Sequence, residues 1–362
     1  MKSVANRIKR VFQNAKADVL VIGLAFAMDS NFLYMTDLPV DTMEGAFLII
    51  KRKGMTLLVN QLDYEIAEQN RPREMKVVKI GSSKQLVSEL KKHLEGRRVG
   101  INGRYLPQNY FRFLKKYSKA KEILDQSDAF AIARTIKDNS EIAKIKKANL
   151  IVKGALREIP ERFRQGMTER QLAAEFDCLV RIKGGLSIPG FASIVSFDKN
   201  AALPHHMPDD TKLKPNSIVL LDVGVSYKNY CSDVTRTFIF KPDRKSAKHA
   251  KMIEIYGIVK GAQQEALKAI KPGASAASIH NIAADYINKA AGGKYKGTFI
   301  HSLGHSLGID VHDGGIGFSP GYRQKLKAGM VITDEPGIYV VGFGGVRIED
   351  DVLVTKTGAK IL

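Results

Sequence analysis

Two strand-like runs carry the most informative acidic residues of the chain: Val219-Leu220-Leu221-Asp222-Val223-Gly224-Val225 and Tyr230-Cys231-Ser232-Asp233-Val234-Thr235-Arg236-Thr237. Both runs are rich in β-branched and apolar residues, as strands are. The intervening segment from Ser226 to Asn229 has the composition of a turn. The sequence therefore predicts a β-hairpin with one aspartate on each strand.

The pairing of these strands suggests a metal. A hairpin centred between Tyr227 and Lys228 places Asp222 directly opposite Asp233, where side chains lie roughly 4.5 to 5.5 Å apart and like charges destabilise the pair. Neither run contains a lysine, and Arg236 alternates to the other face. We therefore expect a divalent metal between the carboxylates, since it suits hard oxygen ligands and removes their repulsion. A slipped register, with both aspartates solvated at strand ends, is the alternative.

Composition limits the class of protein. A chain of 362 residues with 44% hydrophobic and 26% charged residues is expected to form two soluble globular domains. The net charge of +20 raises the question of a nucleic-acid partner. However, the cations are dispersed, often beside carboxylates, as in Lys144, Lys146 and Lys147 after Glu141, and no basic tract is interleaved with aromatics. A lysine-rich solvated surface is the favoured interpretation, and nucleic acid is not an expected partner.

Two further segments bear on the compartment. Cys178 and Cys231 form no spaced motif and are predicted to be two buried thiols in a reducing compartment. The apolar run Val19–Met28 follows basic residues as in a signal peptide, but Asp18 abuts it, so a strand is favoured. The run is also shorter than the ~20 residues that span a bilayer. The expected location is cytoplasmic, without a membrane partner.

Residues 1–125 alternate between helix-like and strand-like segments, with strands predicted over Val19–Ala27, Ala46–Lys51 and Thr56–Asn60. This pattern predicts a mixed α/β domain. It contains no cluster of His, Cys and carboxylates at ligand spacing. Residues 126–139 are predicted to form a polar linker.

Residues 140–362 are predicted to form a second, α+β domain. A capping box at Asp138 and Glu141 begins one helix, and others are predicted from Thr168, over Ser246–Ile270 and over Ser275–Ala291. Strands follow each pair of helices. Two successive helix-helix-strand units predict a pseudo-two-fold domain with one sheet made from both halves and a site between them.

A histidine-rich run lies in the second half of this domain, with three histidines in twelve residues: His301, His305 and His312. Gly304 and Gly308 argue against a helix here, so a strand or extended loop is expected to bring these imidazoles to one side. His280, in an Ala-rich helix, is interpreted as a satisfied core residue.

Two more strand-like runs carry carboxylates, Val331–Gly337 and Gly345–Asp351. Pro336 cannot donate to a sheet, so a strand must end or bulge at Glu335, which would turn this carboxylate into a cleft. The neighbouring acids are expected to stay in solvent or to bind groups around a metal site instead of the metal itself: Asp334, Asp350 and Asp351.

The full set of candidate ligands comprises Asp222, Asp233, His305, Glu335 and Glu349. With the phrases Tyr230–Thr237, His301–His305, Glu335–Gly337 and Gly345–Asp350, it is similar to the pita-bread metallopeptidases. The branch it resembles comprises the Xaa-Pro dipeptidases (prolidases) and Xaa-Pro aminopeptidases. Asn31–Thr36 and the α/β pattern of residues 1–125 are similar to the creatinase-like N-terminal domain of that family.

The resemblance implies a ligand set. Asp233 and Glu349 would bridge two metals, Asp222 would complete one of them, and His305 with Glu335 the other. One histidine among four carboxylates favours Mn(II) or Co(II), with Fe(II) or Zn(II) as further candidates. Two such ions can hold a bridging hydroxide and polarise the scissile carbonyl. Glu335 would then shuttle a proton to the leaving amine.

The resemblance also implies roles for residues beyond the ligands. His205 and His312 match substrate-side histidines that hydrogen-bond the carbonyl or the tetrahedral intermediate. His301 is expected to form a wall of the substrate site, and Arg347 to orient a ligand carboxylate. The expected assembly is a homodimer.

The expected activity is hydrolysis of Xaa-Pro dipeptides. Many prolidases carry a basic residue shortly after the last histidine, whereas this chain has His312-Asp313-Gly314-Gly315-Ile316. An Xaa-Pro aminopeptidase acting on longer peptides is therefore the alternative. A methionine aminopeptidase is disfavoured by the long N-terminal domain. A non-catalytic pita-bread binding protein and a metal-free creatine amidinohydrolase are disfavoured by the complete ligand set.

Overall fold

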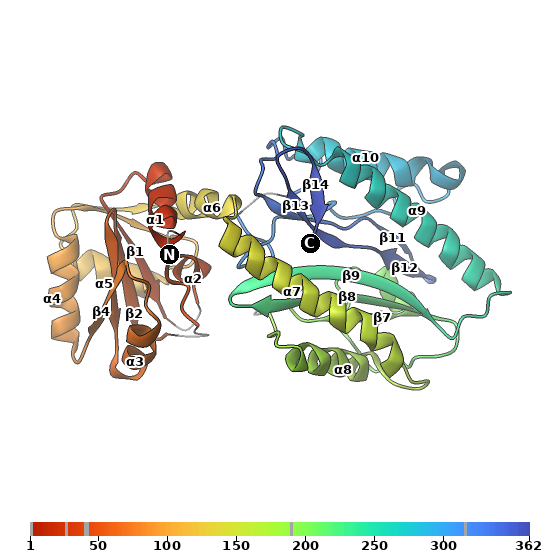
Figure 1. Ribbon diagram of the computed structural model, residues 1–362, viewed down its shortest axis with the longest axis horizontal. Helices are drawn as coiled ribbons and strands as arrows, with labels where there is room; N and C mark the ends of the chain where they lie inside the picture. The colour runs from red at the N-terminus through yellow and green to blue at the C-terminus, as the bar shows by residue number, and fades with distance from the viewer. Residues whose placement is uncertain (1–2, 26–27, 40–42, 189–190, 315–316) are drawn as a thin grey trace. The chain divides into compact units, whose positions relative to one another are not determined.

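The computed structural model describes residues 3–25, 28–39, 43–188, 191–314 and 317–362 (Figure 1). The chain divides into two compact units, Met1–Arg134 and Thr135–Leu362. No helix in the described residues is long and apolar enough to cross a membrane. Each unit has its own sheet structure and its own buried core.

The first unit is built on a six-stranded mixed sheet in the order β4-β3-β2-β1-β5-β6. The β1–β2 and β2–β3 pairs are antiparallel and the other pairs parallel. The strands are β1 (Val19–Leu24), β2 (Ala46–Lys51), β3 (Gly54–Val59), β4 (Met75–Lys79), β5 (Arg98–Ile101) and β6 (Glu122–Asp125). The helices are α1 (Ser3–Asn14), α2 (Ser30–Thr36), α3 (Gln61–Asn70), α4 (Ser83–Leu94), α5 (Gln108–Tyr117) and α6 (Ser127–Thr135).

Alternation along these strands explains how the sheet is covered. Val21, Phe47 and Ile49 point to one face and pack against Leu90 and Leu94 of α4. The three strands predicted from the sequence are present, and Ala27, the predicted end of the first, lies outside the described residues.

The segment predicted as a polar linker is largely helix. Helix α6 spans Ser127–Thr135, and its Ala129, Phe130 and Ala133 are buried. Apolar residues at this spacing share one helix face, so burial of that face outweighs the polar character of the flanks.

The second unit begins with two helices and a hairpin. Its first half contains α7 (Asn139–Glu158), η1 (Ile159–Arg162), α8 (Glu169–Ile182), β7 (Ile194–Phe197), η2 (Asp198–Ala202), β8 (Ser217–Tyr227) and β9 (Tyr230–Phe240). Capping boxes begin α7 and α8, with Asp138 and Glu141 at the first and Thr168 and Gln171 at the second. The predicted helix starts are therefore confirmed.

The second half repeats the order of helices and then strands. It contains α9 (Ala247–Ala269), α10 (Ala276–Lys289), η3 (Ala290–Gly293), β10 (Val331–Asp334), β11 (Gly337–Val340), β12 (Gly344–Arg347), β13 (Asp350–Val354) and β14 (Ala359–Ile361). Figure 1 shows α7 and α8 beside β7–β9, and α9 and α10 beside β11–β14.

The strands of this unit form three hydrogen-bonded sets instead of the one expected sheet: β7-β8-β9, β10-β13-β14 and β11-β12. The two halves meet where Glu349 N donates to Thr235 O over 3.2 Å. Each hairpin pairs within its own half, which leaves a seam between the halves.

The two faces of β8 have different neighbours. Val219 and Leu221 pack in the core formed with α7 and α8, whereas Ile218 and Leu220 pack in the core formed with α9 and the last strands. Asp222 continues the second alternating set and therefore faces the seam.

The predicted register of this hairpin is wrong. Asp222 pairs with Thr235, and Asp233 pairs with Gly224. The hairpin turns at Lys228 and Asn229, which have φ values of 48° and 68°. Two positive φ values at the centre are typical of a two-residue hairpin loop, and they move the centre one position along the chain from that predicted.

The new register keeps both aspartates on one face, as diagonal neighbours separated by roughly 7 to 8 Å between backbones. Both are buried, with exposed fractions of 8% for Asp222 and 4% for Asp233, so the solvated alternative is also excluded. The prediction of two buried thiols is half wrong, because Cys231 is buried but Cys178 is exposed.

Candidate metal centre

Side chains from five places in the second unit converge at the seam. Asp222 and Asp233 come from β8 and β9, Glu335 from the break between β10 and β11, Glu349 from the link between β12 and β13, and His305 from the loop before β10. His305 Nε2 lies 3.6 Å from Asp233 Oδ2 and 3.5 Å from Glu335 Oε1. Ligand atoms of Asp233, His305 and Glu349 all lie within 4.8 Å of one another.

Proline determines where Glu335 points. Strand β10 ends at Asp334 and β11 begins at Gly337, as expected from a residue that cannot donate to a sheet. In this break Glu335 N donates to Leu303 O over 2.9 Å, and Thr333 Oγ1 donates to Glu335 Oε1 over 3.1 Å. The carboxylate is thereby directed toward His305.

The carboxylates repel one another. Burial raises the pKa of Asp233 well above its usual range, and the charges of Asp222, Asp351 and Glu335 raise it further. Burial also raises the pKa of Glu349, as do the neighbouring Asp233 and Glu335 carboxylates. The protein alone therefore disfavours the ionised form of this cluster.

The hydrogen-bonding of the cluster fits a cation. Asp222 Oδ1, Asp233 Oδ1 and Glu349 Oε1 are buried and have no hydrogen-bond partner in the described structure. Buried carboxylate oxygens are normally satisfied by hydrogen bonds or metal coordination. Unpartnered oxygens from separate strands, together with a free imidazole nitrogen, form a donor set for divalent metal ions.

His305 is held in a suitable tautomer. Its Nδ1 lies 3.3 Å from Ser306 O, which makes Nδ1 the protonated nitrogen and leaves the Nε2 lone pair toward the carboxylates. The backbone N of His305 donates to Thr333 Oγ1 over 3.0 Å. Thr333 therefore links His305 and Glu335, a connection of the kind that fixes metal ligands in place.

Arg347 provides the positive charge inside the cluster. Its Nη2 donates to Asp222 Oδ2 over 2.6 Å, Nη1 donates to Tyr339 Oη over 2.7 Å, and Nε donates to Thr235 Oγ1 over 3.1 Å. Thr235 Oγ1 donates in turn to Glu349 Oε2 over 2.7 Å. Arg347 thus contacts one candidate ligand directly and another through Thr235.

His301 extends this chain of hydrogen bonds. Its Nε2 lies 2.7 Å from Tyr339 Oη, and its Nδ1 lies 2.7 Å from Ser302 O. Because the Tyr339 hydroxyl accepts from Arg347, it donates to His301, whose Nδ1–H then donates to Ser302 O. Burial, followed by the Arg347 charge, lowers the pKa of His301 to about 4, so its ring is neutral at neutral pH.

The two remaining histidines lie on the same side. The His312 ring is 3.9 Å from the His305 ring, and burial with the neighbouring His305 lowers the pKa of His312 to about 4. His205 is exposed and lies near enough to His301 and His312 to contribute to lowering the pKa of both. The structure therefore brings His301, His305 and His312 together at the seam.

Glu169 and His206 form a second acidic and imidazole cluster that sequence reasoning missed. The fully buried Glu169 carboxylate accepts from Phe197 N over 2.6 Å and from Asp209 N over 3.0 Å, and lies 2.7 Å from His206 Nε2. Its oxygens are satisfied, so hydrogen bonding accounts for this cluster without a metal. It anchors the segment that carries His205. The one local signal for this cluster was His206, which directly follows His205 in the sequence and to which no role was assigned from the sequence.

The acids predicted to lie outside the ligand set are all buried, and two of them bind groups around the site, which is the second of the two expected outcomes. Asp350 pairs with Arg236 at 2.8 Å and Lys153 at 2.9 Å. Asp351 accepts from Asn149 Nδ2 over 2.7 Å and from Asp233 N over 3.1 Å. The buried Asp334 carboxylate has no hydrogen-bond partner among the described residues, and the structure offers no explanation for it.

His280 is a core residue, as predicted. It is buried in α10, and its Nδ1 accepts from Leu303 N over 3.1 Å. Burial lowers the pKa of the ring, which agrees with a neutral acceptor. Since Leu303 O receives the Glu335 N–H, His280 supports the backbone that positions Glu335.

Residues 143–356 match the metallopeptidase family M24, and residues 5–136 match the creatinase/prolidase N-terminal domain. The chain belongs to metallopeptidase family M24. As a member it is a metal-dependent peptidase with the creatinase-type N-terminal and pita-bread-type C-terminal architecture expected from the sequence.

Individual relatives of this M24 peptidase agree with the assignment. It is 35% identical over 341 residues to an Xaa-Pro dipeptidase of Pyrococcus horikoshii, covering 93% of this chain and 91% of the relative. The structure of a Pyrococcus horikoshii prolidase is similar, with a TM-score of 0.85 and 32% identity over 100% of this chain and 97% of that one. An X-Pro aminopeptidase from Thermotoga maritima has a TM-score of 0.86 at 28% identity, covering 97% of each chain.

Proposed function

We propose that this M24 peptidase is an Xaa-Pro dipeptidase, which hydrolyses the bond that precedes proline in dipeptides. The observation that carries the proposal is the buried convergence of carboxylates and one imidazole with unpartnered oxygens at the seam. The dipeptidase name of the Pyrococcus horikoshii relative supports the substrate class.

The ligand roles are part of the proposal. Asp233 and Glu349 would bridge two divalent ions, Asp222 would complete one, and His305 with Glu335 the other. When bound, the ions would supply an activated water and a Lewis acid for the scissile carbonyl. We infer Mn(II) or Co(II) from the oxygen-rich donor set.

The side chains around the ligands would handle protons and charge. Glu335, whose pKa burial raises, is suited to take a proton and return it to the leaving amine. His205 and the neutral His312 would donate hydrogen bonds to the oxygen on which negative charge develops. His301 would form a wall of the substrate site, while Arg347 would hold Asp222 in its ligating orientation.

The alternative is an Xaa-Pro aminopeptidase that acts on longer peptides. It is supported by the likeness to the Thermotoga maritima enzyme and by the residue that follows His312. Asp313 is buried and lies 3.3 Å from Lys137 Nζ, so this position offers a dipeptide carboxylate no cation. A cytoplasmic location and a homodimer remain predictions from the sequence.

To test this proposal, the protein is stripped of metal and then reconstituted separately with Mn(II), Co(II), Fe(II) or Zn(II). Each form is offered Ala-Pro, Met-Pro, Ala-Pro-Ala and Met-Ala-Ser, with Glu335→Gln as the inactive control. Cleavage of Ala-Pro and Met-Pro with little hydrolysis of Ala-Pro-Ala is the expected result. Preference for Ala-Pro-Ala would establish the aminopeptidase, and cleavage after Met in Met-Ala-Ser would overturn both.

A further inference from the structure

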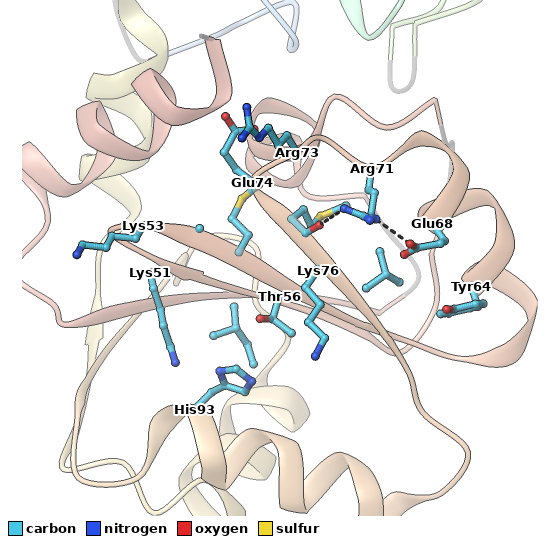
Figure 2. A pocket seen from close by; sticks show the side chains of 15 residues that line it. Lys51, Lys53, Thr56, Tyr64, Glu68, Arg71, Arg73, Glu74, Lys76 and His93 are labelled. Carbon is cyan, nitrogen blue, oxygen red and sulfur yellow. Dashed lines mark hydrogen bonds and ion pairs between the residues drawn. The ribbon is translucent and has the colours of Figure 1, made fainter. Parts of the chain in front are cut away.

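The first unit contains a groove that the metal centre does not explain. It has a volume of about 640 Å³ and is lined by residues of β2, β3, β4, α3 and α4 (Figure 2). The first unit supplies no member of the candidate ligand set. The groove therefore requires its own explanation.

Strand register places several donors on one floor of this groove. Thr56 of β3 pairs with Ile49 of β2 on one side and with Lys76 of β4 on the other. Lys51 follows Ile49 by two residues and so shares its face. Figure 2 shows the Lys51 and Lys76 side chains on either side of Thr56, with His93 facing them. The two lysines lie two strands apart and are offset by two residues along the strand, so spacings of ~4.8 Å between strands and ~3.3 Å per residue put their backbones roughly 12 Å apart.

The groove carries uncompensated positive charge. Its lining includes five cationic side chains and two carboxylates, Glu68 and Glu74. Glu68 is already paired with Arg71 at 2.8 Å. Among the described residues, no carboxylate lies within ion-pair distance of the other four cations: Lys51, Lys53, Arg73 and Lys76.

Partial burial distinguishes this groove from an ordinary solvated lysine surface. Lys51 is half-buried, and burial followed by the charges of Arg97 and Lys92 lowers its pKa. The His93 side chain is only 13% exposed, and its buried Nδ1 has no hydrogen-bond partner in the described structure. Burial and then the Lys51 charge lower the pKa of His93. Glu89 Oε2, 3.6 Å from His93 Nε2, acts in the opposite direction. A bound anion would relieve the remaining repulsion and give His93 Nδ1 an acceptor.

We propose that this groove binds a small oligophosphate, an anion with several phosphate groups along one chain. Four cations without a carboxylate partner line the groove, and an anion with several charges along one chain matches them better than a single phosphate does. Lysine ammonium groups are effective phosphate binders, and the Thr56 hydroxyl between them is a neutral donor. The site is independent of peptide hydrolysis.

The test is calorimetric titration of the full chain with sodium triphosphate. The metal is first removed with a chelator, so that triphosphate can neither bind it nor bridge to it. The remaining carboxylate cluster in the second unit repels anions. One binding site per chain is expected, with Kd rising on addition of salt because ionic contacts are screened.

Paired variants locate the site. Lys51→Ala/Lys76→Ala is expected to raise the Kd for triphosphate at least tenfold. Lys84→Ala/Lys115→Ala makes the same change of charge at two exposed lysines outside the groove lining and is expected to change Kd less than twofold. Lys76→Glu, at an exposed position, gives a second measurement if the double variant unfolds. Equal losses in groove and control variants, or no binding by the unchanged chain, would overturn the proposal.

Three other anions define the ligand class. Orthophosphate is expected to bind at least tenfold more weakly than triphosphate. Adenosine triphosphate contains the same phosphate chain as triphosphate. A difference in Kd between the two therefore shows whether the groove also recognises the nucleoside. If a single-stranded oligonucleotide binds more tightly than triphosphate and loses affinity in Lys51→Ala/Lys76→Ala, the groove belongs to a nucleic-acid surface and the proposal is wrong.

Discussion

Arg347 Nη2 lies 2.6 Å from Asp222 Oδ2. Among the described residues, Arg347 is the only arginine that forms a direct ion pair with a candidate ligand, and its side chain is buried. Its remaining nitrogens donate to Tyr339 and Thr235. A planar group with several fixed donors can satisfy three acceptors at once, which a lysine ammonium on a flexible chain cannot reproduce.

We expect Arg347→Lys to lower the free energy of unfolding by about 1 to 3 kcal/mol, because buried acceptors lose their donors. Activity should fall as Asp222 loses its orientation. Thermal unfolding and kcat at saturating metal measure the two effects. Arg71→Lys, at an exposed pair with Glu68, is the control and should change stability by less than about 1 kcal/mol. Equal stability of the Arg347 variant and the unchanged protein would contradict this account.

Asp233→Asn should abolish metal-dependent activity without unfolding the chain. Changes to groups that only support metal ligands cost about 10- to 100-fold, so the loss of a ligand should cost more. In the presence of chelator the variant should be at least as stable as the unchanged protein, because burial and neighbouring carboxylates raise the pKa of Asp233 and make its charge unfavourable. Metal analysis and thermal unfolding test both points. Retention of the full metal content would refute a ligating role.

His301 should make stability depend on pH. Its folded-state pKa is lowered to about 4 by burial, while unfolded histidine titrates near 6.5. Its contribution is therefore complete above pH ~6.5 and is lost as the pH falls toward 4, amounting to about 2 kcal/mol between pH ~7.5 and ~5.

A comparison with His301→Gln isolates this contribution. Carboxylates with raised pKa act in the opposite direction over the same range, but they are present in both proteins and cancel in the difference. Denaturant unfolding of metal-free protein should show the advantage of the unchanged protein over His301→Gln shrinking as the pH falls. Parallel pH profiles would show that His301 is not buried in its neutral form.

Glu169→Gln should impair catalysis without removing metal. An amide NH2 placed against the Asp209 N–H and His206 loses the contacts that anchor the segment carrying His205. Misplacement of a positioning segment by about 1 Å can cost up to ~100-fold in rate. We expect kcat to fall on the order of tenfold or more at unchanged metal content. Glu175→Gln is the control, because Glu175 lies on α8, as Glu169 does, and forms an exposed ion pair with Arg164. Loss of metal along with activity would indicate a different role.

Local chemistry was sufficient to predict most elements of the second unit. The capping boxes at Asp138 and Thr168 located two helix starts, and Pro336 located the strand break that exposes Glu335. The candidate ligands could be named from the sequence because strand alternation and the family phrases agree. Their convergence depends on contacts between segments more than a hundred residues apart, such as Thr235 with Glu349.

Other features of the fold and the site were not indicated by the neighbouring residues in the sequence. The hairpin register depends on a lysine, Lys228, in the left-handed region, which its residue type does not favour. Tyr339 and Glu169 act through hydrogen bonds to distant segments, and no periodicity reports such contacts. The burial of α6 was missed because its apolar run, Ala129–Ala133, is short and its flanks are polar.

The turn at Lys228 and Asn229 has a consequence for how this chain tolerates insertions and deletions. Loop length normally varies freely at a protein surface. Here one added or deleted residue would shift β9 against β8 and rotate Asp233 and Thr235 out of the seam, since side chains alternate with a period of two. Catalytic competence in this lineage is therefore expected to constrain the length of a surface turn as strictly as the identity of the acidic residues.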